Sequence, residues 1–148
     1  MIPLRDVIPS RTAPVVTVTL IGLNILMFVL QMAQGPDGEA FIRTWGLVPA
    51  AFSWVTVLTS MFLHGGLLHL GGNMLYLWIF GDNVEDRLGR GRFVLFYLAC
   101  GIIAAVGQIV LDPGATLPMI GASGAIAGVM GAYFLLYPRS RVLTLIPL

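Results

Sequence analysis

The stretch GASGAIAGVMGAYFLLY, residues 121–137, decides the expected fold of this chain. With the four residues before it, the stretch is long enough for a helix across the hydrocarbon core, which needs about 20 residues. It places the hydroxyl of Ser123, flanked by residues with almost no side chain, at membrane depth. A second apolar run, residues 58–80, carries three further polar side chains: His64, His69 and Asn73. Polar groups inside such runs predict a functional site within the bilayer.

The composition predicts that lipid is the solvent of most of this surface. The chain has 148 residues, of which 57% are hydrophobic and 10% charged, with a mean hydropathy of +0.91. Soluble domains carry roughly 25% charged residues. The eight basic residues are all arginines and form no basic stripe, so we expect no nucleic-acid partner. The single Cys100 excludes an intrachain disulfide, and we expect it to be a packing residue.

Hydropathy predicts four full spans, at residues 15–32, 58–80, 93–111 and 117–137. A fifth run begins at about residue 142 and has too few residues to span, so the chain looks truncated within its membrane domain. The first run is longer than the ~7–15 residues of a signal-peptide core and has no A-x-A site, so we expect it to be retained. The expected fold is an all-α, polytopic transmembrane helical bundle forming a single membrane domain, residues 1–148.

Arginine placement predicts the orientation of these spans. Alternate connections hold seven and one of the eight arginines, namely Arg5, Arg11, Arg87, Arg90, Arg92, Arg139 and Arg141 against Arg43. The positive-inside rule then places the N-terminus in the cytoplasm, so the second and fourth spans run from the outer face inward. We expect a multi-pass integral protein of a bacterial inner (plasma) membrane.

The polar residues of the second and fourth spans are expected at similar depth. His69 and Asn73 are four residues apart and share a helix face, whereas His64 is rotated away from it. A helix that begins near His64 would place His69 and Asn73 roughly 8 and 14 Å down its axis. A helix that begins near Pro118 would place Ser123 roughly 8 Å down. These depths allow Ser123, His69 and Asn73 to meet at one water-accessible cavity.

Each of these residues also has a structural interpretation. Gly124 and Gly128 form a small-xxx-small pair, and on spacing alone helix packing is the favoured explanation for Ser123. Interhelical hydrogen bonding explains His69 and Asn73 equally well. No metal site is expected, because two histidines five residues apart do not share a face and no nearby carboxylate completes three ligands.

The remaining polar features have simpler explanations. The connection at residues 33–57 is rich in aromatic residues, and an interfacial belt is favoured over a partly embedded loop that shapes access to a site. Glu85 and Arg87 are expected in a solvated cytoplasmic turn. Asn24 and Gln108 are assigned to helix packing.

Three motifs in this order carry a resemblance to a known family. HGGLLHLGGN at residues 64–73, VEDRLG at 84–89 and GASGAIAGVMGAY at 121–133 resemble the rhomboid intramembrane serine proteases, and the likeness covers nearly the whole chain. G-x-S-G alone is weakly specific. Its combination with H-x4-H-x3-N two spans earlier is specific enough to favour catalysis over packing for Ser123.

The resemblance implies roles for eight residues. Ser123 corresponds to the nucleophile, while His69 and Asn73 correspond to side chains that stabilise the oxyanion. The supporting residues are Gly121 and Gly124 beside the nucleophile, His64 for structure and hydration, and Glu85 with Arg87 as a structural loop pair. No cofactor is implied. One family feature is missing, because Trp54 is followed by Val55 where a Trp-Arg pair is usual.

The largest departure concerns the general base. The family's base is a histidine on a sixth span, and this sequence holds two histidines, both on the second span. We therefore expect these 148 residues alone to be inactive. A serine hydroxyl is a weak nucleophile without an adjacent base. The resemblance implies an endopeptidase that cleaves transmembrane segments of other membrane proteins in the bilayer. The alternative is a non-catalytic rhomboid-like membrane chaperone or adaptor.

Overall fold

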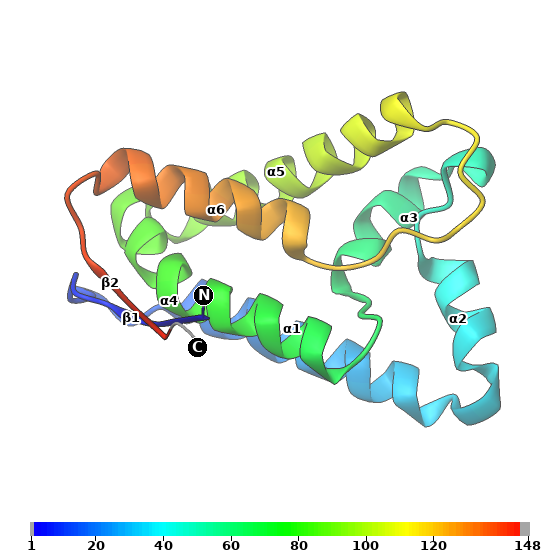
Figure 1. Ribbon diagram of the computed structural model, residues 1–148, viewed down its shortest axis with the longest axis horizontal. Coiled ribbons are helices and arrows are strands. Elements are labelled where there is room, and N and C mark those ends of the chain that lie inside the picture. The colour runs from blue at the N-terminus through cyan, green and yellow to red at the C-terminus, as the bar shows by residue number, and fades with distance from the viewer. Residues whose placement is uncertain (1, 146–148) are drawn as a thin grey trace.

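The computed structural model describes residues 2–145 as a helical bundle with a small two-stranded sheet at one end (Figure 1). In chain order the elements are β1 (Ile2–Asp6), α1 (Val15–Ala33), η1 (Gly35–Asp37), α2 (Gly38–Trp45), η2 (Pro49–Ala51), α3 (Trp54–Thr59), η3 (Ser60–Phe62), α4 (Leu67–Leu88), α5 (Arg90–Leu111), α6 (Ser123–Leu136) and β2 (Val142–Leu145). The expected all-α helical membrane bundle is confirmed.

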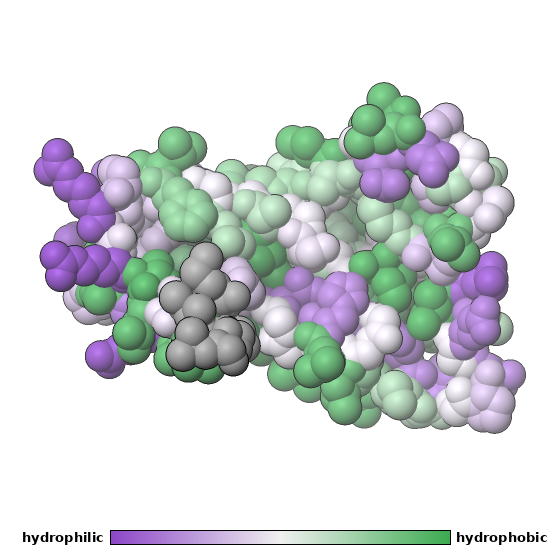
Figure 2. All heavy atoms as spheres, in the orientation of Figure 1, coloured by the Kyte–Doolittle hydropathy of each residue, from purple (hydrophilic) through white to green (hydrophobic). Residues whose placement is uncertain are grey.

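Two of these helices, α1 and α5, are long and apolar enough to cross a membrane. Their outer faces expose leucine, isoleucine and valine side chains, including Leu26 on α1 and Ile103 and Val110 on α5. Figure 2 shows such apolar atoms over much of the surface, with hydrophilic side chains gathered near the sheet and around α2. Lipid is the solvent that suits these faces, because large exposed apolar areas are rare on soluble monomers.

The second expected span differs from the structure. The helical path breaks at residues 63–66, where η3 and α4 meet at a bend of 88°. Gly65 and Gly66 lie at this break, and glycine is a poor helix former. The side chain of Gln31 on α1 also binds the backbone of His64, which replaces helical hydrogen bonds there. α4 then continues to Leu88, well past the expected end at residue 80.

The fourth expected span is shorter than predicted. It begins at Ser123 rather than at residue 117, and it has 14 residues, fewer than the roughly 20 that cross the hydrocarbon core. The residues before it are irregular because Pro118 lacks a backbone N–H and Gly121 has φ +120°. Ser123 therefore lies at the helix N-terminus, not about one and a half turns inside the helix.

The expected start of a fifth helix at residue 142 is wrong for the described residues. Val142–Leu145 form β2, which pairs antiparallel with β1, so that Asp6 lies opposite Val142. Pairing satisfies backbone groups that a four-residue helix would leave open, and β-branched Val142 and Thr144 suit a strand. Residues 146–148 of this run lie outside the described residues.

Three arginine-rich segments lie at one end of the bundle. The β1–β2 pair, the start of α1 and the turn at Gly89 between α4 and α5 are close together in Figure 1. The side chain of Asn83 on α4 donates to Asp6 on β1 at 2.9 Å. α4 and α6 run in the same direction. Both begin at the end of the bundle that lies away from the sheet, and both end near the sheet. The core between them and α5 includes Leu77, Tyr97 and Val129.

Candidate active site

Ser123 is the first residue of α6, and its side chain is exposed. The first intrahelical hydrogen bond runs from Ile126 N–H to Ala122 C=O at 3.0 Å. The N–H groups of Ser123 and the next two residues consequently have no intrahelical acceptor. The helix N-terminus also carries a partial positive charge. This end of α6 can therefore stabilise an anion beside the serine hydroxyl.

The segment before Ser123 is held at two points. Leu47 and Met119 exchange two backbone hydrogen bonds of 3.1 and 2.7 Å, which tie the α2–η2 connection to this segment. Gly121 N–H donates to Ser60 C=O at 2.9 Å. These bonds fix the backbone immediately before the nucleophile candidate and explain why an irregular segment can keep one conformation.

Gly121 brings the α4 residues to the serine. A Cβ atom at this position would lie 2.8 Å from His69 Nε2 and 3.7 Å from Asn73 Nδ2. Such a short approach, together with φ +120°, requires glycine. Ser123, His69 and Asn73 also line one open groove of about 320 Å³ between α4 and α6. The structure thus brings together the three residues that the sequence predicted to meet.

The hydrogen bonding of His69 defines which ring nitrogen can donate. His69 lies in the first turn of α4, and its Nδ1 accepts a hydrogen bond from Gly65 N–H at 3.3 Å. A neutral imidazole that accepts at one nitrogen carries its proton on the other. His69 Nε2 is therefore the donor, and it is the atom that faces Gly121. This arrangement suits an oxyanion donor rather than a general base.

Asn73 has an unsatisfied donor at the same place. Its side chain is 8% exposed, and within residues 2–145 its Nδ2 has no hydrogen-bond partner. A buried donor without a partner costs about 1–3 kcal/mol and needs an explanation. The direction of Asn73 Nδ2 toward Gly121 supplies that explanation, because a group bound at Ser123 would accept a hydrogen bond from this nitrogen.

His64 is buried beside His69, and within residues 2–145 neither nitrogen of its ring has a hydrogen-bond partner. Its ring is fully buried and packs edge-on against His69, with ring centroids 5.2 Å apart. Gln31 holds the His64 backbone through hydrogen bonds of 2.7 and 3.2 Å. Gln31 is a supporting residue that sequence reasoning missed, and a glutamine near the end of an apolar span was its signal. Among the described residues, no group of three His, Cys, Asp or Glu side chains could hold a metal ion.

Gly124 lies on a different face of α6 from the α4 groove. A Cβ on Gly124 would lie 2.5 Å from Ala104 Cβ on α5, and one on Gly128 would collide with Cys100 Sγ. Helix packing by this small-xxx-small pair is therefore real and coexists with the groove at Ser123.

Two expectations about other spans have different outcomes. Asn24 is buried and donates to Leu20 C=O at 2.7 Å, which fits a packing residue within α1. Gln108 is exposed and lines a second cavity of about 220 Å³ that Ser123 also borders. The assignment of Gln108 to helix packing is therefore wrong.

Glu85 and Arg87 do not lie in a solvated turn. Both belong to the last turns of α4, and Glu85 is 2% exposed. The Glu85 carboxylate accepts from the Val16 N–H at 3.0 Å and from the N–H and hydroxyl of Thr17 at 2.8 Å each. Arg87 is exposed, and across residues 2–145 it forms no ion pair with Glu85. Glu85 therefore stabilises the start of α1, because first-turn N–H groups lack intrahelical acceptors.

The aromatic connection between α1 and α4 folds into α2, η2 and α3. Trp45 and Trp54 are 41% and 67% exposed, and Phe52 stacks edge-on against Trp54. Exposed tryptophans are typical of a membrane–water interface. The same connection reaches the candidate site through Leu47, so the belt and the access-shaping interpretations both stay predictions.

Comparisons with known proteins agree on one family. The Rhomboid domain family matches residues 51–148. The chain is 41% identical over 124 residues to Rhomboid protease GluP of Bacillus subtilis, covering 80% of this chain and 24% of that protein. It is 32% identical over 130 residues to Rhomboid protein 1, mitochondrial, of Saccharomyces cerevisiae, covering 84% and 37%. It is 33% identical over 132 residues to the Homo sapiens Presenilin-associated rhomboid-like protein, mitochondrial, covering 85% and 34%.

The chain spans between 24% and 37% of the length of these three relatives. The family match nevertheless covers more than half of the chain and includes His69, Asn73 and Ser123. The family resemblance inferred from the three sequence motifs is thereby confirmed. The chain belongs to the rhomboid family.

Proposed function

We propose that these 148 residues carry the nucleophile and the oxyanion donors of an intramembrane serine endopeptidase. The supporting observation is the position of His69 Nε2 and Asn73 Nδ2, 2.8 and 3.7 Å from a Cβ built on Gly121, two residues before Ser123. Two separate donors directed at the residues beside an exposed serine favour acyl transfer over helix packing.

In the proposed reaction, Ser123 Oγ attacks the scissile carbonyl of a peptide bond while its proton passes to a general base that residues 2–145 do not supply. The carbonyl oxygen becomes an oxyanion and accepts hydrogen bonds from His69 Nε2, Asn73 Nδ2 and the N–H of Ser123. The N-terminus of α6 adds a favourable field. All of these donors are neutral, so no permanent charge has to be buried. Fixed donors of this kind contribute roughly 10²–10³ in rate each.

Neither histidine of the sequence is proposed as the general base. Nε2 of His69 carries a proton, and His64 is fully buried against it. We therefore expect the 148-residue polypeptide by itself to hydrolyse no peptide bond, since residues 2–145 place no base beside the Ser123 hydroxyl. A fluorophosphonate probe should label its serine poorly. Efficient labelling that disappears in Ser123→Ala would contradict this expectation.

The proposed substrates are transmembrane segments of other membrane proteins. The groove between α4 and α6 is open along its length and is lined by apolar residues beyond the polar group, including Leu68, Ile126 and Met130. A partly unwound helix could enter it while its apolar side chains stay in contact with lipid or protein. We propose a cytoplasmic N-terminus in a bacterial inner membrane, from the arginine distribution.

The test uses the longest polypeptide that contains these residues, reconstituted with a model single-span substrate. Ser123→Ala should abolish cleavage without changing the thermal stability, because the Ser123 hydroxyl has no hydrogen-bond partner in the described part of the chain. Ser140→Ala at the other end of the bundle is the matched control and should retain cleavage. Unchanged cleavage in Ser123→Ala would refute the nucleophile assignment.

A second function is a non-catalytic membrane chaperone or adaptor. The observation that favours it is the lack of a base beside the Ser123 hydroxyl among residues 2–145. This function predicts that the substrate binds without being cut and that binding is the same in wild type and Ser123→Ala.

A further inference from the structure

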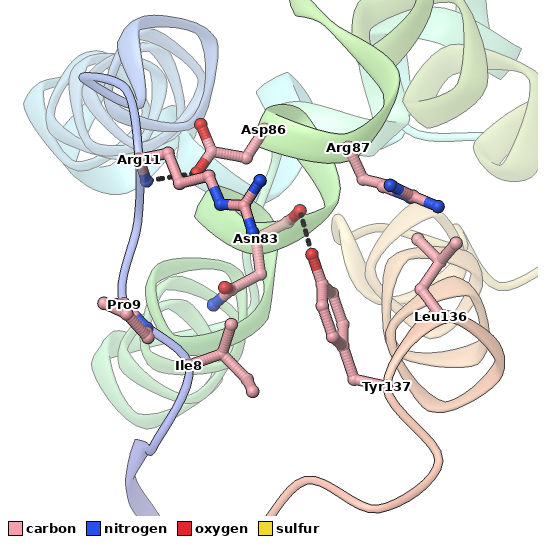
Figure 3. A pocket seen from close by; sticks show the side chains of 8 residues that line it. All are labelled: Ile8, Pro9, Arg11, Asn83, Asp86, Arg87, Leu136 and Tyr137. Atoms are coloured by element: carbon pink, nitrogen blue, oxygen red, sulfur yellow. Dashed lines mark hydrogen bonds between the residues drawn. The ribbon is translucent and has the colours of Figure 1, made fainter.

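A cavity of about 520 Å³ lies at the sheet end of the bundle (Figure 3), beside the last residue of α6, whereas Ser123 is the first residue of that helix. Its volume falls within the roughly 300–1,000 Å³ of small-ligand sites. Its walls come from the segment before α1, the last turns of α4 and the end of α6. The residues that line it include Ile8, Arg11, Asn83, Arg87, Leu136 and Tyr137.

Two guanidinium groups border this cavity with donors to spare. Figure 3 shows the Arg11 side chain extending from the N-terminal segment toward α4, and Arg87 extending toward Leu136. Within residues 2–145, neither arginine forms an ion pair with a carboxylate. A guanidinium offers five N–H donors in a planar fork that matches phosphate oxygens.

The carboxylate in the cavity wall is already engaged. Asp86 accepts hydrogen bonds from the Arg11 and Thr12 backbone N–H groups and from the Thr12 hydroxyl. These bonds use its oxygens on the N-terminal segment, and its charge also attracts the Arg11 guanidinium without forming an ion pair with it. Both arginines therefore keep donors for an external anion.

The charge distribution favours an anion at this end. Seven of the eight arginines lie in the segments at the sheet end, against four carboxylates, Asp6, Asp82, Glu85 and Asp86. The opposite end carries Arg43 against Asp37, Glu39 and Asp112. The sheet end thus has net positive charge and the Ser123 end net negative charge, and such a charge distribution attracts soluble anions toward the sheet end.

The surroundings of the cavity indicate an amphipathic ligand. Leu136 ends an apolar helix, and with Ile8 it adds apolar surface beside the arginines. The ends of membrane helices lie at the level of the lipid headgroups, where basic pockets bind anionic lipids. We propose that this cavity binds the phosphate group of an anionic phospholipid through Arg11 and Arg87.

Binding to the 148-residue chain in neutral detergent tests the proposal. Native mass spectrometry would follow titration with dioctanoyl phosphatidylglycerol, with dioctanoyl phosphatidylcholine as the zwitterionic comparison. Phosphatidylglycerol should bind at least about tenfold more tightly. Arg11→Gln/Arg87→Gln should weaken its binding roughly thirtyfold, since each basic residue near a lipid surface contributes about one factor of five.

The matched control is Arg90→Gln/Arg92→Gln, which removes the same charge from the same end outside the cavity. It should weaken binding by less than about threefold, because only general surface attraction is lost. Equal weakening in the two double variants would overturn the cavity as the site. Arg87→Gln alone keeps the Arg11 contacts and should still lose about fivefold, which covers the case of a misfolded double variant.

Inorganic phosphate distinguishes a lipid from a free anion. A lipid site should keep phosphatidylglycerol bound in millimolar inorganic phosphate, because the apolar walls contribute to lipid binding. Displacement of the lipid by inorganic phosphate at a similar concentration would assign the cavity to a soluble anion and overturn the lipid proposal.

Discussion

The two ends of the α4–α6 pair differ in whether the hydrogen-bond donors at helix N-termini find acceptors within the bundle. At the sheet end, the first-turn N–H groups of α1 donate to the buried carboxylate of Glu85. At the other end, the first turn of α6 begins at exposed Ser123, and the nearby Asn73 Nδ2 has no partner within residues 2–145. One end is closed by hydrogen bonds, and the other is left open.

This difference assigns folding stability to one end of the bundle and the proposed chemistry to the other end. A buried donor that finds an acceptor contributes to folding, while an unpaired one costs about 1–3 kcal/mol. Donors fixed before the reaction are worth more at a developing charge than anywhere else. The hydrogen bonds at the sheet end therefore stabilise the bundle, and in the proposed reaction the open end keeps donors free for an oxyanion at Ser123.

The largest expected effect comes from one asparagine of the open end. Asn73→Leu in the longest active polypeptide should lower the cleavage rate by roughly 10²–10³ through loss of an oxyanion donor. Its thermal stability should stay equal or rise, because an unsatisfied donor leaves the interior. Cleavage rates and melting in the same detergent measure the two effects.

Asn83→Leu is the matched control for this variant, on the same helix at the closed end. Asn83 donates to Asp6 at 2.9 Å, so its loss should lower stability and leave the cleavage rate of the folded protein nearly unchanged. If Asn73→Leu instead lost stability as Asn83→Leu does, Asn73 would be a structural residue and the contrast between the ends would fail.

The closed end should show its largest stability effect at Glu85. Glu85→Ala removes the acceptor of two backbone N–H groups and of the Thr17 hydroxyl, and should lower the free energy of unfolding by roughly 2–4 kcal/mol. Glu85→Gln keeps one acceptor oxygen and should lose about half as much. Unfolding in mixed micelles measures these differences.

Arg87→Ala is the control for Glu85, two residues further along α4. Its side chain is exposed and is expected to change the free energy of unfolding by less than about 0.5 kcal/mol in neutral detergent. A loss at Arg87 as large as that at Glu85 would favour the loop pair expected from the resemblance over the contact with α1.

The sequence predicts the long regular helices well because their signal is local. α1 and α5 begin and end within about three residues of the expected spans, since apolar runs of this length have few other structures in lipid. The grouping of Ser123, His69 and Asn73 could also be predicted from the sequence. It follows from the spacing of these residues along their helices and from the shared direction of the two helices through the membrane.

The features that the sequence missed depend on contacts between distant residues. Glu85 is buried because it binds Thr17, 68 residues away, and no local pattern reveals that partner. The break before α4 depends on Gln31 binding the His64 backbone. β2 depends on pairing with β1 at the other end of the chain. Apolar composition alone would continue a helix through the break before α4 and through β2.

Packing between α5 and α6 holds the open end of the bundle in place. Gly128→Ala should cost about 1–3 kcal/mol of unfolding free energy, since the new methyl collides with Cys100 Sγ. Gly131→Ala on the same helix meets nothing within 4 Å and should be neutral or stabilising by up to ~1 kcal/mol. Equal effects would mean that α6 does not pack on α5 through this face.

The smallest expected effect tests whether the difference in burial between Glu85 and Asp86 changes how much their hydrogen bonds stabilise the fold. Asp86 accepts from the Arg11 and Thr12 N–H groups much as Glu85 does from α1, but it is only partly buried. Asp86→Ala should therefore cost about 1 kcal/mol, because water can replace the lost acceptor there. Unfolding in the same micelles gives the comparison with Glu85→Ala, whose expected loss is larger. If the two losses in unfolding free energy were equal, burial would not determine how much these hydrogen bonds stabilise the fold. The high cost of an unpaired Asn73 would then lose its physical basis as well.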